Sequence, residues 1–237
     1  MKAVVCTGYG PPEVLRIEGV ERPVPKEDEV LIRVRATTVH VGDTRIRRAD
    51  PFVVRLIFGL LRPKKIPILG MECAGVVEEV GSDVTGFAVG DEVFAFAGFT
   101  FGAYAEYICL PGMVRPGKIE KSGVVSKKPL NLGFDEAAAV PAGMLTVLKV
   151  FEKLVIEEGM SVLVYGASGS LGTYAVQYAK YLDARVTGVC SGGNLDLVRS
   201  IGADHVVDYT TEDFTRIDER FDIIFDAVGK TSKTAIL

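Results

Sequence analysis

A run of glycines between an apolar stretch and a helical pattern constrains the fold of this chain more than any other feature. The run "SVLVYGASGSLGTYAVQYAKYL" covers residues 161–182. Its first five residues are typical of a buried strand, and Ala, Val and Tyr residues at helical spacing follow the glycines. The segment therefore predicts a strand at Ser161–Tyr165, a tight turn, and a helix at Ser170–Leu182.

The spacing of Gly166, Gly169 and Gly172 is typical of a turn that binds the pyrophosphate of a dinucleotide. The first glycine permits the tight turn, the second lets a pyrophosphate approach the backbone, and the third lets the helix pack closely on the strand. We expect the backbone N–H groups from Ser168 to Leu171, and the two serine hydroxyls of this range, to face that phosphate at the positive end of the helix. Packing alone is the alternative role for such glycines.

The residues that follow repeat the alternation of strand and helix. We expect strands at Arg185–Cys190, His205–Tyr209 and Phe221–Val228, and a helix at Asn194–Ile201. This order predicts a parallel sheet with helices on both faces. A doubly wound sheet normally has about six strands. Because the chain stops at Leu237, shortly after the last expected strand, we expect an incomplete version of a longer protein; a naturally compact variant is the alternative.

The first half of the chain has a different pattern. From Met1 to Leu110, short β-branched segments such as "EVLIRVRATTVH" and "CAGVVEEVG" alternate with Gly and Pro, which indicates a small barrel or sandwich. Residues 111–132 lose this pattern and are interpreted as a crossover between two domains. A helical pattern follows in residues 133–154, with Asp135 as a possible N-cap and an interruption at Pro141.

Composition excludes several classes of protein. With 48% hydrophobic residues, 24% charged residues and a net charge of −4, the 237-residue chain reads as a globular protein of two domains without a basic stripe for nucleic acid. Its four cysteines lack C-x-x-C spacing, which argues against a zinc cluster or a secreted disulfide framework and favours the cytoplasm. The apolar residues 51–63, interrupted by Arg55, are too short to span a membrane. They predict a short amphipathic helix packed on its own domain, with a substrate lip or an oligomer contact as alternatives.

The strand after the glycine-rich segment ends in the small, neutral residues "CSGGN". A site that prefers NAD usually has an acidic residue here, because a carboxylate binds the ribose 2′-hydroxyl and repels a 2′-phosphate. NADP is therefore favoured over NAD, with Ser191 and Asn194 at the phosphate. Asp196 lies close by, and between Ser191 and Arg199 there is no Lys or Arg that could pair with that phosphate. Alternatively, Asn194 only caps the next helix.

Several segments, taken together, resemble the medium-chain dehydrogenase/reductase superfamily, in its zinc-independent quinone oxidoreductase branch. They include "EVLIRVRATTVHVGD", "PILGMECAGVVEEVGSDVTGFAVGDEVFA", "AAAVPAGMLTV", "VLVYGASGSLG" and "FDIIFDAVG", in order along nearly the whole chain. The resemblance implies a fold of α/β plus β class, with a GroES-like β-barrel at residues 1–125 and a partial Rossmann domain at residues 126–237. It also implies NADPH in the cleft between the domains. A C-terminal segment returning to the barrel would be absent, and a homodimer is expected at full length.

The resemblance also bears on zinc. Zinc alcohol dehydrogenases bind their catalytic metal with a Cys, a Gly-His-Glu triplet and a second Cys. Here the triplet reads Gly70-Met71-Glu72, and a thioether does not replace imidazole as a zinc ligand. His40 occupies the first Cys position, and the second has no Cys. The resemblance therefore implies no zinc, with a site built from His40, Glu72 and a further ligand as the alternative.

Matching positions imply roles for individual residues. His40 replaces an Asn close to the nicotinamide and is expected to donate a hydrogen bond or a proton to the oxygen that becomes negative. The alternative is a histidine satisfied at the end of a barrel strand. Asp43 matches an acidic position of the family and is expected to form an orienting ion pair with Arg47. Thr146 matches a threonine that faces the nicotinamide amide.

Further matches concern the cofactor. Asn194 stands where relatives often have a Lys for the 2′-phosphate, and Tyr209 matches a tyrosine near that phosphate. The turn whose backbone lines the riboses corresponds to Asp226, Ala227, Val228 and Gly229.

The resemblance implies an NADPH-dependent oxidoreductase that transfers hydride to a quinone or an α,β-unsaturated carbonyl. One alternative is an enoyl thioester reductase, which a tyrosine acid near the nicotinamide would favour, and none is clearly placed. Another is a cofactor-binding homologue with little turnover. For the chain as given we expect weak or absent turnover, because the unfinished sheet removes cofactor contacts.

Overall fold

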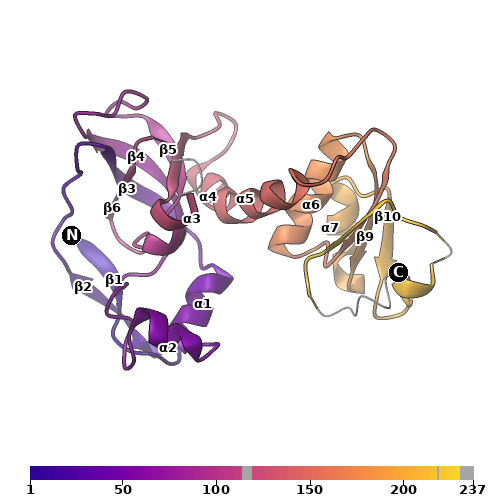
Figure 1. Cartoon of the computed structure of the whole chain (residues 1–237), viewed down its shortest axis with the longest axis horizontal. Helices are drawn as coiled ribbons and strands as arrows, with labels where there is room; N and C mark the ends of the chain where they lie inside the picture. The colour runs from indigo at the N-terminus through magenta and orange to yellow at the C-terminus, as the bar shows by residue number, and fades with distance from the viewer. Residues whose placement is uncertain (114–118, 218, 230–237) are drawn as a thin grey trace. The chain divides into compact units, whose positions relative to one another are not determined.

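A computed structural model of the chain describes residues 1–113, 119–217 and 219–229. The chain divides into two compact units, Met1–Ala142 (unit 1) and Gly143–Leu237 (unit 2). The division falls inside helix α5 (Val140–Phe151), because the preceding helix α4 (Phe134–Ala138) packs its buried alanines against β-strands of unit 1. The domain boundary between residues 125 and 126 stays a prediction. Figure 1 shows the order of the elements along the chain.

Unit 1 contains a five-stranded antiparallel sheet in the order β6-β3-β4-β5-β7 and a two-stranded ladder of β1 and β2. The strands are β1 Lys2–Cys6, β2 Leu15–Gly19, β3 Glu29–Thr37, β4 Glu72–Val80, β5 Glu92–Phe96, β6 Tyr107–Pro111 and β7 Val124–Lys127. Alternate residues of β3, Val30 and Ile32, lie in one apolar core with Val77 and Val93. Strand β7 lies in the range expected to be irregular, because only its pairing with β5 reveals so short a strand.

In the described part of unit 1, helices α1 (Val41–Arg48) and α2 (Val53–Phe58) lie between β3 and β4, α3 (Ile119–Ser122) lies between β6 and β7, and α4 follows β7. Two short 3-10 turns, Pro12–Val14 and Gly98–Thr100, complete the described part of the unit. Helix α1 was not expected from the sequence, because the strand pattern of "EVLIRVRATTVH" runs to His40. The strand ends at Thr37, and His40 is the N-cap of α1.

The sequence signals for the start of α4 and for the break between α4 and α5 can be compared with the structure. The N-cap of α4 is Gly133 rather than Asp135, and the Glu136 carboxylate accepts a 2.7 Å hydrogen bond from the Gly133 N–H. The predicted cap was therefore wrong, because the carboxylate three residues on performs the capping. The expected interruption at Pro141 is confirmed, since α4 ends at Ala138 and α5 begins at Val140.

Unit 2 is built on a four-stranded parallel sheet in the order β10-β9-β8-β11. Its strands are β8 Ser161–Tyr165, β9 Arg185–Cys190, β10 His205–Asp208 and β11 Ile223–Asp226, and its other elements are α6 Ser170–Tyr181, α7 Leu195–Ser200 and the 3-10 turns Gly192–Asn194 and Phe214–Arg216. The chain runs outward from β8 to β10 and then returns to pair β11 on the other side of β8. The carboxyl end of β8 is therefore the point where the strand order reverses, which is where ligands bind in open α/β sheets.

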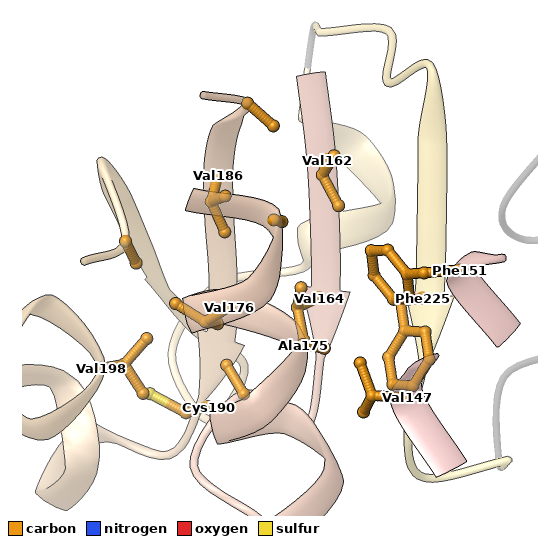
Figure 2. Packing of buried hydrophobic residues seen from close by; sticks show 14 residues of the cluster. Val147, Phe151, Val162, Val164, Ala175, Val176, Val186, Cys190, Val198 and Phe225 are labelled. Carbon is orange, nitrogen blue, oxygen red and sulfur yellow. The ribbon is translucent and has the colours of Figure 1, made fainter. Parts of the chain in front are cut away.

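One face of this sheet carries the main core of unit 2. Figure 2 shows side chains from three helices meeting the same layer of valines on β8 and β9: Val147, Phe151, Ala175, Val176 and Val198 against Val162, Val164 and Val186. In the described part of unit 2, the α-helices pack on this face and the other face has only a 3-10 helix, Phe214–Arg216, so the expectation of helices on both faces holds only in part. The other face packs against Phe214, Ile217 and Phe221, which belong to a largely irregular segment.

Candidate functional site

The glycine turn at the end of β8 is fixed by its backbone. Gly166 has φ +80°, a left-handed conformation that favours glycine. The N–H groups of Gly166 and Ala167 both donate to the Val189 carbonyl, at 2.9 and 3.0 Å, which ties the turn to β9. A Cβ on Gly166 would lie 2.6 Å from Val228 Cγ2, so the turn also lies against the end of β11.

The other two glycines differ sharply in their surroundings. A Cβ on Gly172 would lie 2.1 Å from the Gly166 carbonyl oxygen and 2.7 Å from Ala167 Cα, so α6 approaches the turn too closely for any side chain. At Gly169, φ is −80° and the nearest heavy atom would lie 3.4 Å from the Cβ. Among the described residues, nothing therefore requires a glycine at position 169. The absence of a side chain there leaves backbone open to an approaching ligand.

The first turn of α6 presents its backbone N–H groups at this turn. Gly169 is the N-cap, and the first intrahelical bond runs from the Thr173 N–H to the Gly169 carbonyl at 2.8 Å. The N–H groups of Ser170 and Leu171 precede that bond, and in the described chain no side chain caps the helix. The Gly169 N–H, however, donates to the Gly166 carbonyl at 3.0 Å. The expectation that every N–H from Ser168 to Leu171 faces a ligand was therefore wrong at Gly169.

A second turn lies beside the first, directly after β11. The Asp226 carboxylate accepts hydrogen bonds from the N–H groups of Val228 and Gly229, both at 2.8 Å. The Ala227 N–H donates to the Tyr165 carbonyl at 3.0 Å. Asp226 thus shapes the backbone of this turn, and the structure brings the four predicted ribose-lining residues next to the glycine turn.

The loop after β9 lies beside a carboxylate that the sequence analysis missed. Asn194 occupies the N-cap position of α7, as the capping alternative expected, but its side chain makes no cap hydrogen bond, and its Nδ2 donates to Ser191 Oγ at 3.0 Å instead. A Cβ on Gly192 would lie 2.5 Å from Asp208 Oδ2. Hydrogen bonds from the Thr210 hydroxyl and N–H hold the pKa of Asp208 below its usual value. A negative charge therefore stands next to a loop whose own residues are neutral. Its position at the carboxyl end of the neighbouring parallel strand is the signal that could have found it.

Tyr209 lies at the same edge of the sheet. Its N–H donates to the Cys190 carbonyl at 3.1 Å, and its ring meets the Tyr165 ring edge-on with centroids 6.3 Å apart. The side chain is half-exposed. The residues predicted to lie near a 2′-phosphate are thus gathered at the ends of β9 and β10.

His40 in unit 1 has a defined tautomer. Its Nδ1 accepts a 3.0 Å hydrogen bond from the Gly42 N–H at the start of α1. A nitrogen that accepts a hydrogen bond carries no proton, so the proton of neutral His40 lies on Nε2. The imidazole is half-buried and presents Nε2–H as a hydrogen-bond donor.

Asp43 lies in the first turn of helix α1, three residues after the N-cap His40, and is buried. Its carboxylate accepts hydrogen bonds from the Gly70 N–H at 2.9 Å, the Tyr104 hydroxyl at 3.1 Å and the His40 N–H at 3.2 Å. Burial raises the pKa of Asp43, although these hydrogen bonds oppose the shift. The expected ion pair with Arg47 was wrong, because the Arg47 guanidinium donates to the Gly10 carbonyl instead.

Tyr104 is a residue of this cluster that sequence reasoning missed. Burial and the neighbouring Asp43 charge raise the pKa of Tyr104 far above its usual value, so the phenol stays protonated at neutral pH. Tyr104 lies in the segment "AYAEY" at residues 103–107, and only the tertiary contact with Asp43 distinguishes it from the other tyrosine of that segment.

Glu72 and Met71 occupy the positions of the metal-binding triplet. Both carboxylate oxygens of Glu72 are engaged: one accepts from the Thr38 hydroxyl at 2.5 Å and the other from the Ala142 N–H at 2.8 Å. Burial raises the pKa of Glu72. The described residues contain no group of three or more His, Cys, Asp or Glu side chains that could hold a metal ion. Both Glu72 oxygens and the Nδ1 atom of His40 already have protein partners, which disfavours the alternative zinc site, and the absence of zinc stays a prediction.

The remaining predicted residue, Thr146, lies in α5 within unit 2, next to the buried Val147. Its side chain is exposed. The structure thus forms two groups of predicted residues, His40 with Asp43 in unit 1 and the glycine and Asp226 turns in unit 2.

Comparison with known proteins finds a matching family for each half of the chain. Residues 26–145 match the family described as the alcohol dehydrogenase GroES-like domain, and residues 170–237 match the family described as zinc-binding dehydrogenase. The chain is 36% identical, over 98% of its length, to 2-methylene-furan-3-one reductase of Solanum lycopersicum. It is 32% identical, over 98% of its length, to the chloroplastic NADPH-dependent alkenal/one oxidoreductase of Arabidopsis thaliana. It spans 58% of the length of each of these relatives.

Among solved structures, the quinone oxidoreductase of Coxiella burnetii is similar with a TM-score of 0.81 and 30% identity, covering 97% of this chain and 69% of that one. The expected fold, a GroES-like barrel followed by a partial Rossmann domain, is therefore confirmed. The chain belongs to the medium-chain dehydrogenase/reductase superfamily, in its quinone oxidoreductase-like branch.

Proposed function

We propose that the protein is an NADPH-dependent oxidoreductase that reduces a quinone or an α,β-unsaturated carbonyl. The observation that carries this proposal is the open backbone at Gly169, at the N-terminus of a 12-residue helix and at the reversal point of a parallel sheet. This position suits a pyrophosphate, because backbone N–H groups and the helix dipole both attract negative charge. The names of the tomato and Arabidopsis relatives support reduction of an enone.

NADP(H) is proposed over NAD(H) for two reasons. The Arabidopsis relative is described as NADPH-dependent, and the residues from Ser191 to Asn194 include no acid. The Asp208 carboxylate opposes this preference, because it stands beside Gly192 and would repel a 2′-phosphate. Tyr209, Thr146 and the turn at Asp226 complete the proposed cofactor contacts.

When bound, the nicotinamide supplies the hydride, so the protein has to hold the acceptor and stabilise the charge it gains. His40 is suited to this task, since its Nε2–H donates a hydrogen bond to an oxygen that becomes negative. The Tyr104 hydroxyl, which stays protonated, is a second proton source in the same cluster. Asp43 acts as a positioning residue because it accepts from both His40 N–H and Tyr104.

Tyr104 favours a second candidate function, that of an enoyl thioester reductase. In such an enzyme the Tyr104 phenol would protonate the carbon that receives no hydride, and the raised pKa of Tyr104, which makes the phenol a weaker acid, opposes this role. A substrate panel that includes an enoyl thioester separates this candidate from a quinone or enone reductase.

The proposal assigns no zinc to the chemistry, since both Glu72 oxygens and the Nδ1 atom of His40 already have protein partners. It assigns the protein to the cytoplasm, as all four cysteines are free thiols. In the described chain, no helix has the length and apolar character needed to cross a membrane. A homodimer remains a prediction.

Two measurements test the proposal: calorimetric titration with NADPH and NADH, and the consumption of NADPH with quinones, enones and an enoyl thioester. We expect NADPH binding that Gly169→Ala weakens. With a quinone or enone we expect weak or absent turnover by this chain and faster turnover by a version extended with further strands, and His40→Ala should lower the rate of the extended version. Tight NADPH binding without turnover by the chain and by a version extended with further strands would instead support a cofactor-binding homologue. Absence of dinucleotide binding would refute the proposal.

A further inference from the structure

A segment of unit 1 exposes several large apolar side chains that lie close together in the sequence. Within residues 51–65, here called the α2 segment, six such residues are 49–82% exposed: Phe52, Val53, Leu56, Ile57, Leu60 and Leu61. Single exposed apolar residues are normal on a protein surface, whereas a contiguous group marks an interaction site. The sequence analysis expected this helix to pack on its own domain, and the structure buries only part of it.

The buried part anchors the segment firmly. Val54 is 8% exposed and lies in the core of this region. The Tyr9 hydroxyl donates to the Gly59 carbonyl at 2.7 Å. The Arg55 guanidinium lies 4.7 Å from the centroid of the Tyr9 ring and donates to the Leu60 carbonyl at 3.1 Å. The exposed apolar side chains are therefore presented by an ordered backbone, so little conformational entropy remains to be lost on binding.

The charge around the segment is strongly positive. Residues 44–65 contain seven Lys or Arg residues and one acidic residue, Asp50, in a chain whose net charge is −4. Five of these cations are exposed: Arg45, Arg48, Arg62, Lys64 and Lys65. Figure 1 shows α1 and α2, which carry part of this charge, as neighbours within unit 1. The partner that complements both properties has an apolar interior and an anionic surface.

An anionic lipid bilayer has these two properties together. A second copy of the chain fits less well, because a symmetric contact would bring the same cations face to face. We propose that the α2 segment docks the protein on anionic membranes, with its apolar side chains in the headgroup region and its cations against lipid phosphates. This inference goes beyond the proposed function and does not depend on it.

Sedimentation with lipid vesicles tests the proposal on the 237-residue chain. One set of vesicles contains only phosphatidylcholine, and the other contains phosphatidylcholine with phosphatidylglycerol. We expect binding to the anionic vesicles that weakens as salt is added, and little binding to the neutral ones. No binding to anionic vesicles, or equal binding to both sets, would overturn the proposal.

Paired variants locate the binding surface. Leu56→Ser with Leu61→Ser is expected to lower the partition coefficient on anionic vesicles by about tenfold or more. The matched control, Val24→Ser with Val89→Ser, removes two apolar side chains that are 80% and 68% exposed elsewhere in unit 1. Circular dichroism confirms that each variant is folded. Equal binding by the two double variants would place the contact elsewhere and refute the assignment.

A second pair separates local charge from net charge. The variant Arg62→Gln, Lys64→Gln, Lys65→Gln should bind anionic vesicles about fivefold more weakly for each cation removed. The control Arg16→Gln, Lys153→Gln, Arg220→Gln changes the net charge equally and should bind like wild type. If size-exclusion chromatography shows a dimer that Leu56→Ser with Leu61→Ser dissociates, and no protein binds vesicles, the segment is an interface between copies and the membrane proposal is wrong.

Discussion

Replacing Gly169 and Gly172 separately by alanine should affect two different properties of unit 2. At Gly172 the new Cβ would lie 2.1 Å from a backbone carbonyl oxygen, far inside the 3.0 Å that Cβ contacts keep. Relieving such a clash by shifting α6 costs about 1–3 kcal/mol, and the higher helix propensity of alanine returns up to about 1 kcal/mol. We therefore expect Gly172→Ala to lower the free energy of unfolding by about 1–2 kcal/mol.

Gly169→Ala should leave stability nearly unchanged, because φ is −80° and the nearest heavy atom would lie 3.4 Å from the Cβ. Alanine is a poorer N-cap than glycine, which lowers stability, but it also lowers the backbone entropy of the unfolded chain, which raises stability. The two effects nearly cancel, to within about 0.5 kcal/mol. The new methyl group would, however, stand where a pyrophosphate approaches. We expect the dissociation constant for NADPH to rise about tenfold or more.

Urea unfolding followed by circular dichroism, and calorimetric titration with NADPH, measure the two effects. The midpoint of Gly172→Ala should fall by up to about 1 M urea, and that of Gly169→Ala should not move measurably. The reasoning would be refuted if Gly169→Ala lost as much stability as Gly172→Ala. It would equally be refuted if folded Gly169→Ala bound NADPH as tightly as wild type.

Three further changes test the residues that surround these turns and His40. Tyr104→Phe removes the hydroxyl that donates to Asp43. Steady-state kinetics should show a kcat that is about 100-fold lower and an unchanged affinity for NADPH. An unchanged kcat would exclude Tyr104 as an acid. Asp43→Asn replaces a carboxylate that accepts three hydrogen bonds, so we expect unfolding measurements at neutral pH to show a loss of about 1–3 kcal/mol. Because burial raises the pKa of Asp43 in the folded state, the folded protein binds its proton more tightly than the unfolded chain does. The stability of wild type relative to this variant should therefore increase as pH falls from the pKa of Asp43 in the folded protein towards its ordinary value of 3.8. A decrease over that pH range would contradict the upward shift of the pKa of Asp43. Asp208→Asn removes the charge beside Gly192 and should tighten binding of NADPH relative to NADH by about fivefold. If titration shows an unchanged ratio of the two dissociation constants, Asp208 does not face the ribose.

The fold of unit 2 was predictable because its signals are local. A strand, three glycines and a helix follow one another within 22 residues, and each element carries its own periodicity. The glycine positions also follow from backbone geometry, since only glycine suits φ +80° at Gly166 and the 2.1 Å approach at Gly172. In unit 1, the longer strands were predictable for the same reason. Strand β7 and helix α1 were missed, because pairing with β5 and capping by His40 decide them.

The candidate site was predictable only in part. The glycine turn was predicted from its own residues, whereas His40, Asp43 and the turn at Asp226 were predicted from the family resemblance, and their roles stay predictions. It did not show that Asp43 bonds Tyr104, which is 61 residues away, because only the tertiary fold brings helix α1 next to the segment that contains Tyr104. Asp208 was missed as well, although its place at the carboxyl end of the strand next to β9 is a signal that could have revealed its position beside Gly192.

The sequence by itself therefore determined the family, the order of the two domains and the place of the glycine turn, since each rests on residues adjacent in the chain. Only the tertiary structure decided which groups stay free to act. It engages the Glu72 oxygens, directs Arg47 to Gly10 and fixes the His40 proton on Nε2. It also leaves the apolar side chains of the α2 segment exposed. Burial and hydrogen bonding are properties of the packed chain, and they decide which side chains remain available for chemistry or for binding.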